Sequence, residues 1–183
     1  MSVRKGSRTK ARIRAIDVLF EADERFGRVT GRDLRELLEQ RKQVFAAQTP
    51  LPPYAVQIVE GVAGHLSQID SSIESFSTRN WRRLPSVDRS ILRVAVWEIL
   101  FNDDVDDVVA ITEAVGISDS LSASDAPAFI NAVLDKVKGT HGGGVFLDEL
   151  DPELAGVDES SDEDDDGLSG DIADAYAGEY LDE

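Results

Sequence analysis

The sequence contains no cysteine and only two histidines, His65 and His141. Without cysteine there can be no disulfide framework, no thiol nucleophile and no metal site built on thiolates. The two histidines are far apart in the chain and give no local support for a metal site, so we interpret His65 as a surface or boundary residue. The absence of cysteine also suits a reducing compartment, and we expect a cytoplasmic protein.

Long apolar runs are also missing. The most apolar stretch is residues 86–102, SVDRSILRVAVWEILFN, and it includes four charged residues. A helix that crosses a bilayer needs about 20 mainly apolar residues, so this stretch is too short and too charged. The basic residues at the start are not followed by an apolar segment, which excludes a signal peptide. We therefore expect no membrane segment.

Motifs for catalysis are missing as well. The sequence has no glycine-rich phosphate loop of the GxxxxGKS or GxGxxG type, no GxSxG and no HExxH. The paired carboxylates at 103–104 and 106–107 could attract a divalent cation, but they lack the spacing and the closing glutamate of an EF-hand. A solvated loop is the favoured interpretation. The sequence thus predicts a protein without enzymatic activity, cofactor or metal ion.

What the sequence does have is helical periodicity. Residues 86–102 are apolar on nearly every side, as in a buried helix, with Ser86 as its N-cap and Asp88 in the first turn. No segment alternates with a period of two, so we expect an all-α fold. Gly116 should weaken the fifth helix, and Gly139 should stop the last one. The expected helices are 9–26, 30–45, 53–76, 86–102, about 108–115, and 125–138.

Charge is distributed very unevenly along the chain. Six basic and no acidic residues lie among the first fourteen, whereas residues 148–183 contain 16 of the 36 acidic residues and no basic one. We expect a helical domain at 1–141 that begins with a flexible basic arm at 1–7, followed by a disordered acidic tail at 142–183. One hypothesis is that the tail folds back over the basic start and competes there with phosphate ligands. The alternative is a tail that serves only solubility.

Five segments together resemble the NusB family of transcription antitermination factors. They extend in order over roughly residues 8–138, and Trp81 also matches. The combination of VDRSILRVAVWE in the third segment with FINAVLDKV in the fifth is far more specific than any one motif. The matching segments are ARIRAIDVLFEAD (11–23), IVEGVAGHLSQID (58–70), VDRSILRVAVWEILFN (87–102), VAITEAV (109–115) and SDAPAFINAVLDKV (124–137).

The resemblance implies an all-helical fold of two small bundles that share a long helix. Proteins of this family pair with NusE, a small-subunit ribosomal protein. The pair binds the single-stranded boxA element of nascent rRNA leader transcripts and joins other Nus factors on RNA polymerase to suppress termination. The resemblance therefore implies a binding module with no chemical step of its own.

The resemblance also implies roles for particular residues. Basic side chains expected to face outward would hold RNA phosphates, because arginine offers a planar fork of donors. Two residues at the start of the last helix match positions near the RNA, although Phe129 also fits a core position. Two others match the NusE interface, although Asp88 also fits a helix N-terminus. The RNA set is Arg4, Lys5, Arg8, Lys10, Arg12, Arg14, Asp125 and Phe129, and the NusE set is Phe20 and Asp88.

The chain departs from the family pattern at residues 116–120, GISDS, where relatives have a firmer helix with a lysine. An RNA contact from that turn is therefore in doubt. The rRNA cytosine methyltransferases also have a NusB-like domain, but this chain has neither their cofactor-binding domain nor a cysteine nucleophile. The remaining alternative is a protein-only adapter or homodimer with weak, non-specific RNA binding.

Overall fold

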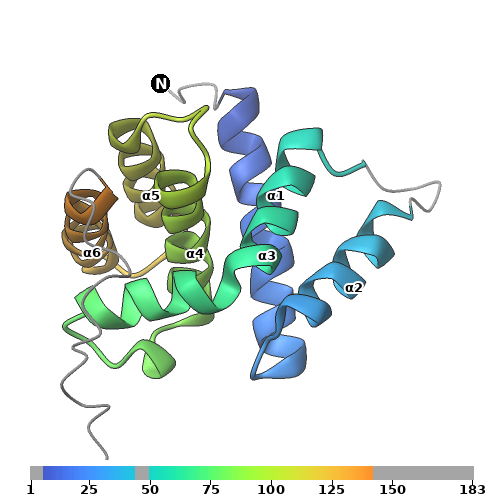
Figure 1. The fold of residues 1–183 in the computed structure, drawn as a ribbon, viewed down its shortest axis with the longest axis horizontal. Helices are drawn as coiled ribbons and strands as arrows, with labels where there is room; N and C mark the ends of the chain where they lie inside the picture. Colours follow the sequence, from blue (N-terminus) through green and yellow to red (C-terminus); the bar gives the residue numbers. More distant parts are fainter. Residues whose placement is uncertain (1–5, 44–49, 142–183) are drawn as a thin grey trace, which may run out of the picture. The chain divides into compact units, whose positions relative to one another are not determined.

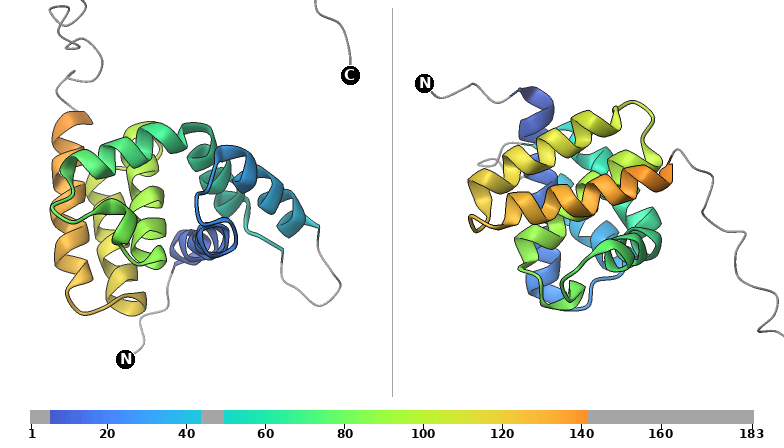
Figure 2. Two further views of the ribbon diagram at one scale, coloured as in Figure 1. Left: turned by 90° about the horizontal axis from the view of Figure 1, so that it is seen from below. Right: turned by 90° about the vertical axis from the view of Figure 1, so that its left-hand side faces the viewer.

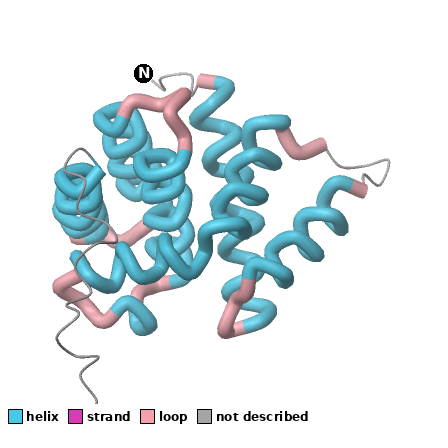
Figure 3. The backbone as a smooth tube through the Cα atoms, viewed as in Figure 1, coloured by secondary structure: helices cyan, strands magenta, loops and turns pink. Residues whose placement is uncertain are grey.

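A computed structural model describes residues 6–43 and 50–141, and the secondary structure within these ranges is entirely helical (Figures 1 and 3). The all-α prediction is confirmed. The expected flexible arm and acidic tail lie outside the described residues, apart from the last two arm positions. The elements are α1 (Ser7–Phe26), α2 (Gly31–Lys42), α3 (Pro53–Phe76), the short 3-10 helix η1 (Trp81–Arg83), α4 (Ser86–Phe101), α5 (Asp107–Leu121) and α6 (Ala126–His141).

The long helix α3 joins two groups of helices, as the resemblance implied. Its first part lies beside α1 and α2, and the part after a bend runs towards α4 and α6 (Figure 1). Viewed along α1, α2 lies on one side and α4, α5 and α6 lie on the other (Figure 2, left). The fold is therefore two small bundles connected through α3, with α1 packed against both α3 and α4.

The bend in α3 occurs at His65, whose backbone is not helical (φ −122°, ψ 18°). Its Nδ1 atom lies 2.9 Å from the carbonyl oxygen of Gly61, the acceptor that a regular helix would offer to the backbone of His65. Helices kink where a side chain competes for this ladder of hydrogen bonds. The imidazole also stacks on Phe101 with 4.0 Å between ring centroids, so His65 is a boundary residue that shapes the helix.

Helix α4 is the buried centre of the second bundle. Eleven of its sixteen residues are buried, including Asp88 and every position from Ser90 to Ile99. The predicted N-cap at Ser86 is wrong, because Pro85 holds the cap position and Ser86 is the first helical residue. The Ser86 hydroxyl instead donates to the Glu24 carboxylate at 2.7 Å, which joins the start of α4 to the end of α1.

Several helix ends differ from the sequence-based expectations. Helix α5 continues through Gly116 to Leu121, and α6 continues past Gly139. A glycine inside a helix costs only about 1 kcal/mol relative to alanine, and the burial of Ile117 outweighs that cost in α5. The prediction that α2 extends to about Phe45 is wrong, because the helix ends at Lys42 and the backbone of its C-cap, Gln43, is extended (φ −72°, ψ 94°).

Gly61 is required by the close approach of α3 to α4. A Cβ atom at this position would lie 2.0 Å from Nε1 of the buried Trp97. The substitution Gly61→Ala should therefore lower the free energy of unfolding by about 1–3 kcal/mol or more, because a packed core resists added volume. Urea denaturation measures this change.

The matched control is Gly116→Ala in α5, where an added Cβ would meet nothing within 4 Å. This change should raise the free energy of unfolding by about 0.5–1 kcal/mol through helix propensity alone. If both substitutions changed the free energy of unfolding by the same amount, the close approach of Trp97 would not be the reason that position 61 requires glycine.

Candidate RNA and partner interface

The first two turns of α1 expose three basic side chains, but not on one face. Lys10 and Arg14 are four residues apart and share one side of α1. Arg8 lies on the other side, where its guanidinium carbon is 5.3 Å from the centre of the Tyr54 ring. Arg14 also forms an exposed ion pair with Asp17 at 3.5 Å. The basic start therefore offers two separate exposed surfaces. Arg4 and Lys5 lie outside the described residues.

Arg12 is not on either surface, and the expectation that it faces outward is wrong. The residue is 2% exposed, and its Nε atom donates to both carboxylate oxygens of Glu98 at 2.9 and 3.0 Å. Its Nη1 atom lies 3.4 Å from a carboxylate oxygen of Glu113. Arg12 follows Ala11 and precedes Ile16 by one helical turn, which places it on the core side of α1.

Arg12 is the centre of a buried polar network that joins both bundles. The Tyr54 hydroxyl donates to Glu98, and Asn102 Nδ2 donates to the Tyr54 oxygen at 3.3 Å. Burial and the contact with Glu98 raise the pKa of Tyr54 above its ordinary value. Burial lowers the pKa of Arg12, but Glu98, Tyr54 and Glu113 together outweigh burial and raise it, so the guanidinium stays charged. This network is a structural joint between α1, α3, α4 and α5.

The structure brings Asp125 and Phe129 together at the start of α6 through a third residue, Arg79. Nη2 of Arg79 donates to the exposed Asp125 carboxylate at 2.9 Å. The guanidinium carbon of Arg79 lies 4.5 Å from the centre of the Phe129 ring. Phe129 is only 7% exposed and belongs to the core, as the alternative interpretation stated. The Arg79 side chain is itself exposed to solvent, so it lies between the Phe129 ring and the surface.

Sequence reasoning did not identify Arg79. The available signal was the density of basic residues at 79, 82 and 83, in a segment without acidic residues that precedes the central helix. Three cationic side chains in so short a segment indicate an anion-binding surface as well as a turn.

The two residues expected at the NusE interface differ in exposure. Phe20 is 41% exposed on α1, and Phe26 at the end of the same helix is 38% exposed. Asp88 is buried in the first turn of α4, and its Oδ1 atom has no hydrogen-bond partner. Asp88 lies in the first turn of α4, as the alternative stated, and its burial leaves no exposed carboxylate for a direct contact. Its role at the NusE interface stays a prediction.

Two classes of feature associated with other functions are not found in the part of the chain that the structure describes. No group of three or more potential metal ligands of the histidine, cysteine or acidic type occurs there. Within residues 6–43 and 50–141, no helix is both long enough and apolar enough to cross a membrane.

Two connected helical bundles, with exposed cations on the first helix and beside the last one, define a helical binding module. The model of the NusB family matches residues 9–138. The chain belongs to the NusB family, and the resemblance seen in the sequence is confirmed.

Curated relatives support this membership. The transcription antitermination protein NusB of Bifidobacterium longum subsp. infantis is 50% identical over 133 residues, which cover 72% of this chain and 68% of the relative. The protein of the same name from Beutenbergia cavernae is 44% identical over 136 residues, covering 72% of this chain and 88% of the relative. The expectation that the chain is not an enzyme is confirmed by its membership of this family of transcription antitermination factors.

Solved structures show the same fold. Thermotoga maritima NusB is 28% identical with a TM-score of 0.59, and the match covers 75% of this chain and 94% of that one. A crystal structure of the antitermination factors NusB and NusE in complex with double-stranded RNA matches at 28% identity and a TM-score of 0.57. That match covers 73% of this chain and 96% of the solved one.

Proposed function

We propose that this chain is a transcription antitermination factor that binds boxA RNA of nascent rRNA leader transcripts together with NusE. In this proposal the complex joins other Nus factors on RNA polymerase in the cytoplasm. The observation that carries the proposal is the match to a NusB structure solved with both NusE and RNA. The shared fold over most of both chains makes the same two partners the first to test.

The proposed RNA surface keeps most of the residues expected from the sequence. Lys10 and Arg14 form one exposed pair on α1, and Arg8 is exposed beside Tyr54. Arg4 and Lys5 extend this basic set, although they lie outside the described residues. Arg12 is removed from it, because Glu98 and Glu113 already occupy its guanidinium in the core.

At the start of α6, the proposed RNA contact is Arg79 together with Asp125 and Phe129. RNA bases stack on aromatic rings and on arginine guanidinium planes. Because the Arg79 guanidinium covers Phe129, a base can stack on Arg79 while Phe129 supports it from below. Asp125 fixes the orientation of Arg79 through its hydrogen bond.

The proposed NusE surface is built around Phe20. An exposed aromatic side chain on a rigid helix is a typical anchor of a protein interface. The Ser86–Glu24 hydrogen bond fixes α4 against α1 one turn beyond Phe20. Asp88 is buried and can act on this surface only through its charge at the start of α4.

The test is RNA binding by the full chain, with and without NusE, to boxA RNA and to a scrambled RNA across a range of salt concentrations. We expect tighter binding to boxA, strengthened by NusE. If about four to six phosphates are contacted, the logarithm of the binding constant should fall against the logarithm of salt concentration with a slope of roughly −3 to −4.

The substitutions Lys10→Ala and Arg14→Ala together should make this slope less negative by about 1.4, at about 0.7 per lost phosphate contact. The control changes Arg35 and Lys136 to alanine, which removes the same charge from exposed positions on α2 and α6. Equal, weak binding to both RNAs that NusE does not affect would reject the proposal and favour the protein-only adapter.

A further inference from the structure

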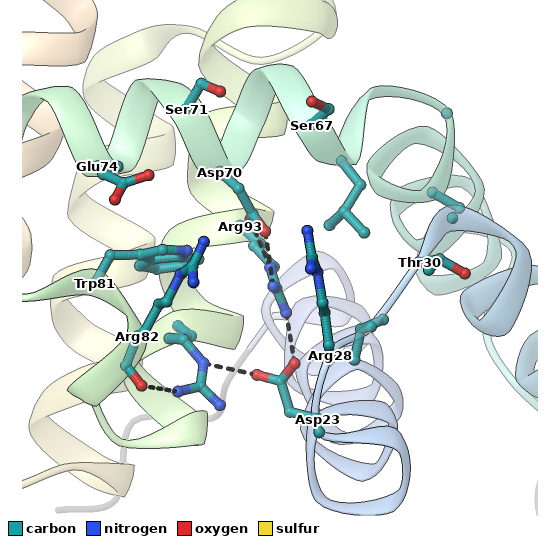
Figure 4. Close-up of a pocket in the computed structure, with 17 residues that line it drawn as sticks. Asp23, Arg28, Thr30, Ser67, Asp70, Ser71, Glu74, Trp81, Arg82 and Arg93 are labelled. Carbon is teal, nitrogen blue, oxygen red and sulfur yellow. Dashed lines mark hydrogen bonds and ion pairs between the residues drawn. The ribbon is translucent and has the colours of Figure 1, made fainter.

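A cleft lies where the two bundles meet. Its volume is about 770 Å³, and its walls come from the end of α1, the start of α2, the middle of α3, η1 and the start of α4 (Figure 4). Four arginines line it, together with three acidic residues. None of the cleft residues belongs to the RNA or NusE sets expected from the sequence.

The floor of the cleft is a closed network of opposite charges. Arg93 donates to Asp70 at 2.8 and 2.9 Å and to Asp23 at 2.8 Å. Arg89 donates to the other oxygen of Asp23 at 2.9 Å. Burial lowers the pKa of Arg93, but Asp70 and Asp23 outweigh burial and raise it, so the Arg93 guanidinium stays charged. Two arginines balance two carboxylates, and the floor has no net charge.

Two further arginines remain uncompensated on the walls. Arg28 and Arg82 are exposed, and within the described ranges neither side chain forms an ion pair or hydrogen bond. Both guanidinium groups point towards α3, on either side of Arg93 (Figure 4). The cleft therefore presents two free planar cations at its walls above a neutral floor.

The local backbone fixes both arginines. Gly27 has a positive φ of 68°, which ends α1 and turns the chain so that Arg28 faces the cleft. The amide of Arg82 donates to the Asn80 side chain at 3.0 Å, and its carbonyl accepts from Arg89 at 3.3 Å. The backbone of both residues is thus fixed before any ligand arrives, which lowers the entropic cost of binding.

We propose that this cleft binds a phosphate group of RNA through Arg28 and Arg82, an inference that rests on the proposed RNA-binding function. Guanidinium groups bind phosphate oxygens by paired, charge-assisted hydrogen bonds. The exposed hydroxyls of Ser67 and Ser71 line the same cleft and add donors from α3. Glu74 is the one opposing charge without a partner, and it limits the affinity.

RNA is the occupant because the cleft adjoins the proposed RNA surface. Arg79, which covers Phe129 and pairs with Asp125, is only three residues before Arg82 in the same short segment. A strand that stacks on Arg79 needs a place for its next phosphates, and Arg82 is the nearest free cation along the chain. Phosphate contacts position a nucleic acid without reading its sequence. The cleft should therefore strengthen binding to any RNA.

The experiment compares the unaltered chain with the double substitution Arg28→Ala and Arg82→Ala, using boxA and scrambled RNA over a salt series. We expect about tenfold weaker binding to both RNAs and a slope less negative by about 0.7–1.4. Both side chains are exposed and unpartnered, so the variant should fold normally, which circular dichroism checks. Glu74→Gln should have the opposite effect and tighten binding.

The control is again Arg35→Ala with Lys136→Ala, which removes two exposed cations outside the cleft. A parallel arm titrates inorganic phosphate and follows the cleft amides by NMR, which separates a free-phosphate site from an RNA contact. Unchanged RNA binding by the Arg28 and Arg82 variant overturns the inference while leaving the proposed function intact. If the Arg28 and Arg82 variant loses only NusE binding and keeps its RNA binding, the inference is overturned, and the cleft binds an acidic protein segment instead of RNA. Absence of RNA binding by the unaltered chain overturns both proposals.

Discussion

Replacement of Arg12 by methionine should lower the free energy of unfolding by about 3–5 kcal/mol, because it leaves a buried charge without its counter-charge. Glu98 is 1% exposed, and Arg12 donates to both of its carboxylate oxygens. Methionine fills part of the volume but offers no donor. Urea denaturation of the full chain, monitored by circular dichroism, measures the change.

Two further variants separate the buried ion pair from a general effect of losing a cation. Arg14→Met, on the exposed side of the same helix, should change the free energy of unfolding by no more than about 0.5 kcal/mol. Adding Glu98→Gln to Arg12→Met should recover part of the loss, because it removes the uncompensated charge. A double variant as unstable as the single one would show that the packing of Arg12, and not the charge of Glu98, dominates.

The same substitution also tests whether Arg12 has any role in RNA binding. Because its guanidinium is buried and paired, Arg12→Met should leave the salt slope of RNA binding unchanged at a temperature where the variant is folded. A slope less negative by about 0.7 would show that Arg12 leaves the core and contacts a phosphate.

The helices could be predicted from sequence because their signals are local. The bounds of α3 follow from apolar residues at alternating spacings of four and three, between Pro53 and Phe76. The burial of α4 follows from a sequence that is apolar on every side. Such patterns depend only on residues within a few turns of each other. The bend at His65 was not predictable in this way, because it depends on the geometry of one side chain.

The position of Arg12 could not be predicted because its partner is distant in the sequence. Its interaction with Glu98 spans 86 residues. A basic residue among other basic residues looks like exposed charge until the carboxylate that faces it is known. Only the packing of α1 against α4, with the ion pair to Glu113 of α5, shows that this one arginine belongs to the core.

Phe129 and Arg79 illustrate the same limit at the candidate RNA site. The pattern of α6 was compatible with both a core and a surface role for Phe129, and the structure shows that the ring is mostly buried. What remains of its surface lies under Arg79, whose hydrogen bond to Asp125 spans 46 residues. The family resemblance indicated the start of α6 as the site. That Arg79 is the exposed group there could be learned only from the three-dimensional structure.

Asp23→Asn is expected to lower the free energy of unfolding by about 2–4 kcal/mol, because hydrogen bonds to charged groups contribute about 1.5–3 kcal/mol each. Asp23 is buried and accepts from Arg89 at 2.9 Å and from Arg93 at 2.8 Å. It is the residue through which α1 binds both arginines of α4. Asparagine keeps one acceptor oxygen, so one of the two arginines loses its partner on α1. Urea denaturation again gives the value.

The control for this prediction is Asp17→Asn on the same helix. Among the described residues, Asp17 pairs only with Arg14, at 3.5 Å, and both side chains are exposed. Its loss should change the free energy of unfolding by no more than about 0.5 kcal/mol, because water screens exposed ion pairs. Since the two substitutions make the same chemical change in one helix, their difference isolates the contribution of burial and of the two arginine contacts. Similar small effects would mean that Asp70 alone holds Arg93 in place, and that the floor of the cleft does not need α1.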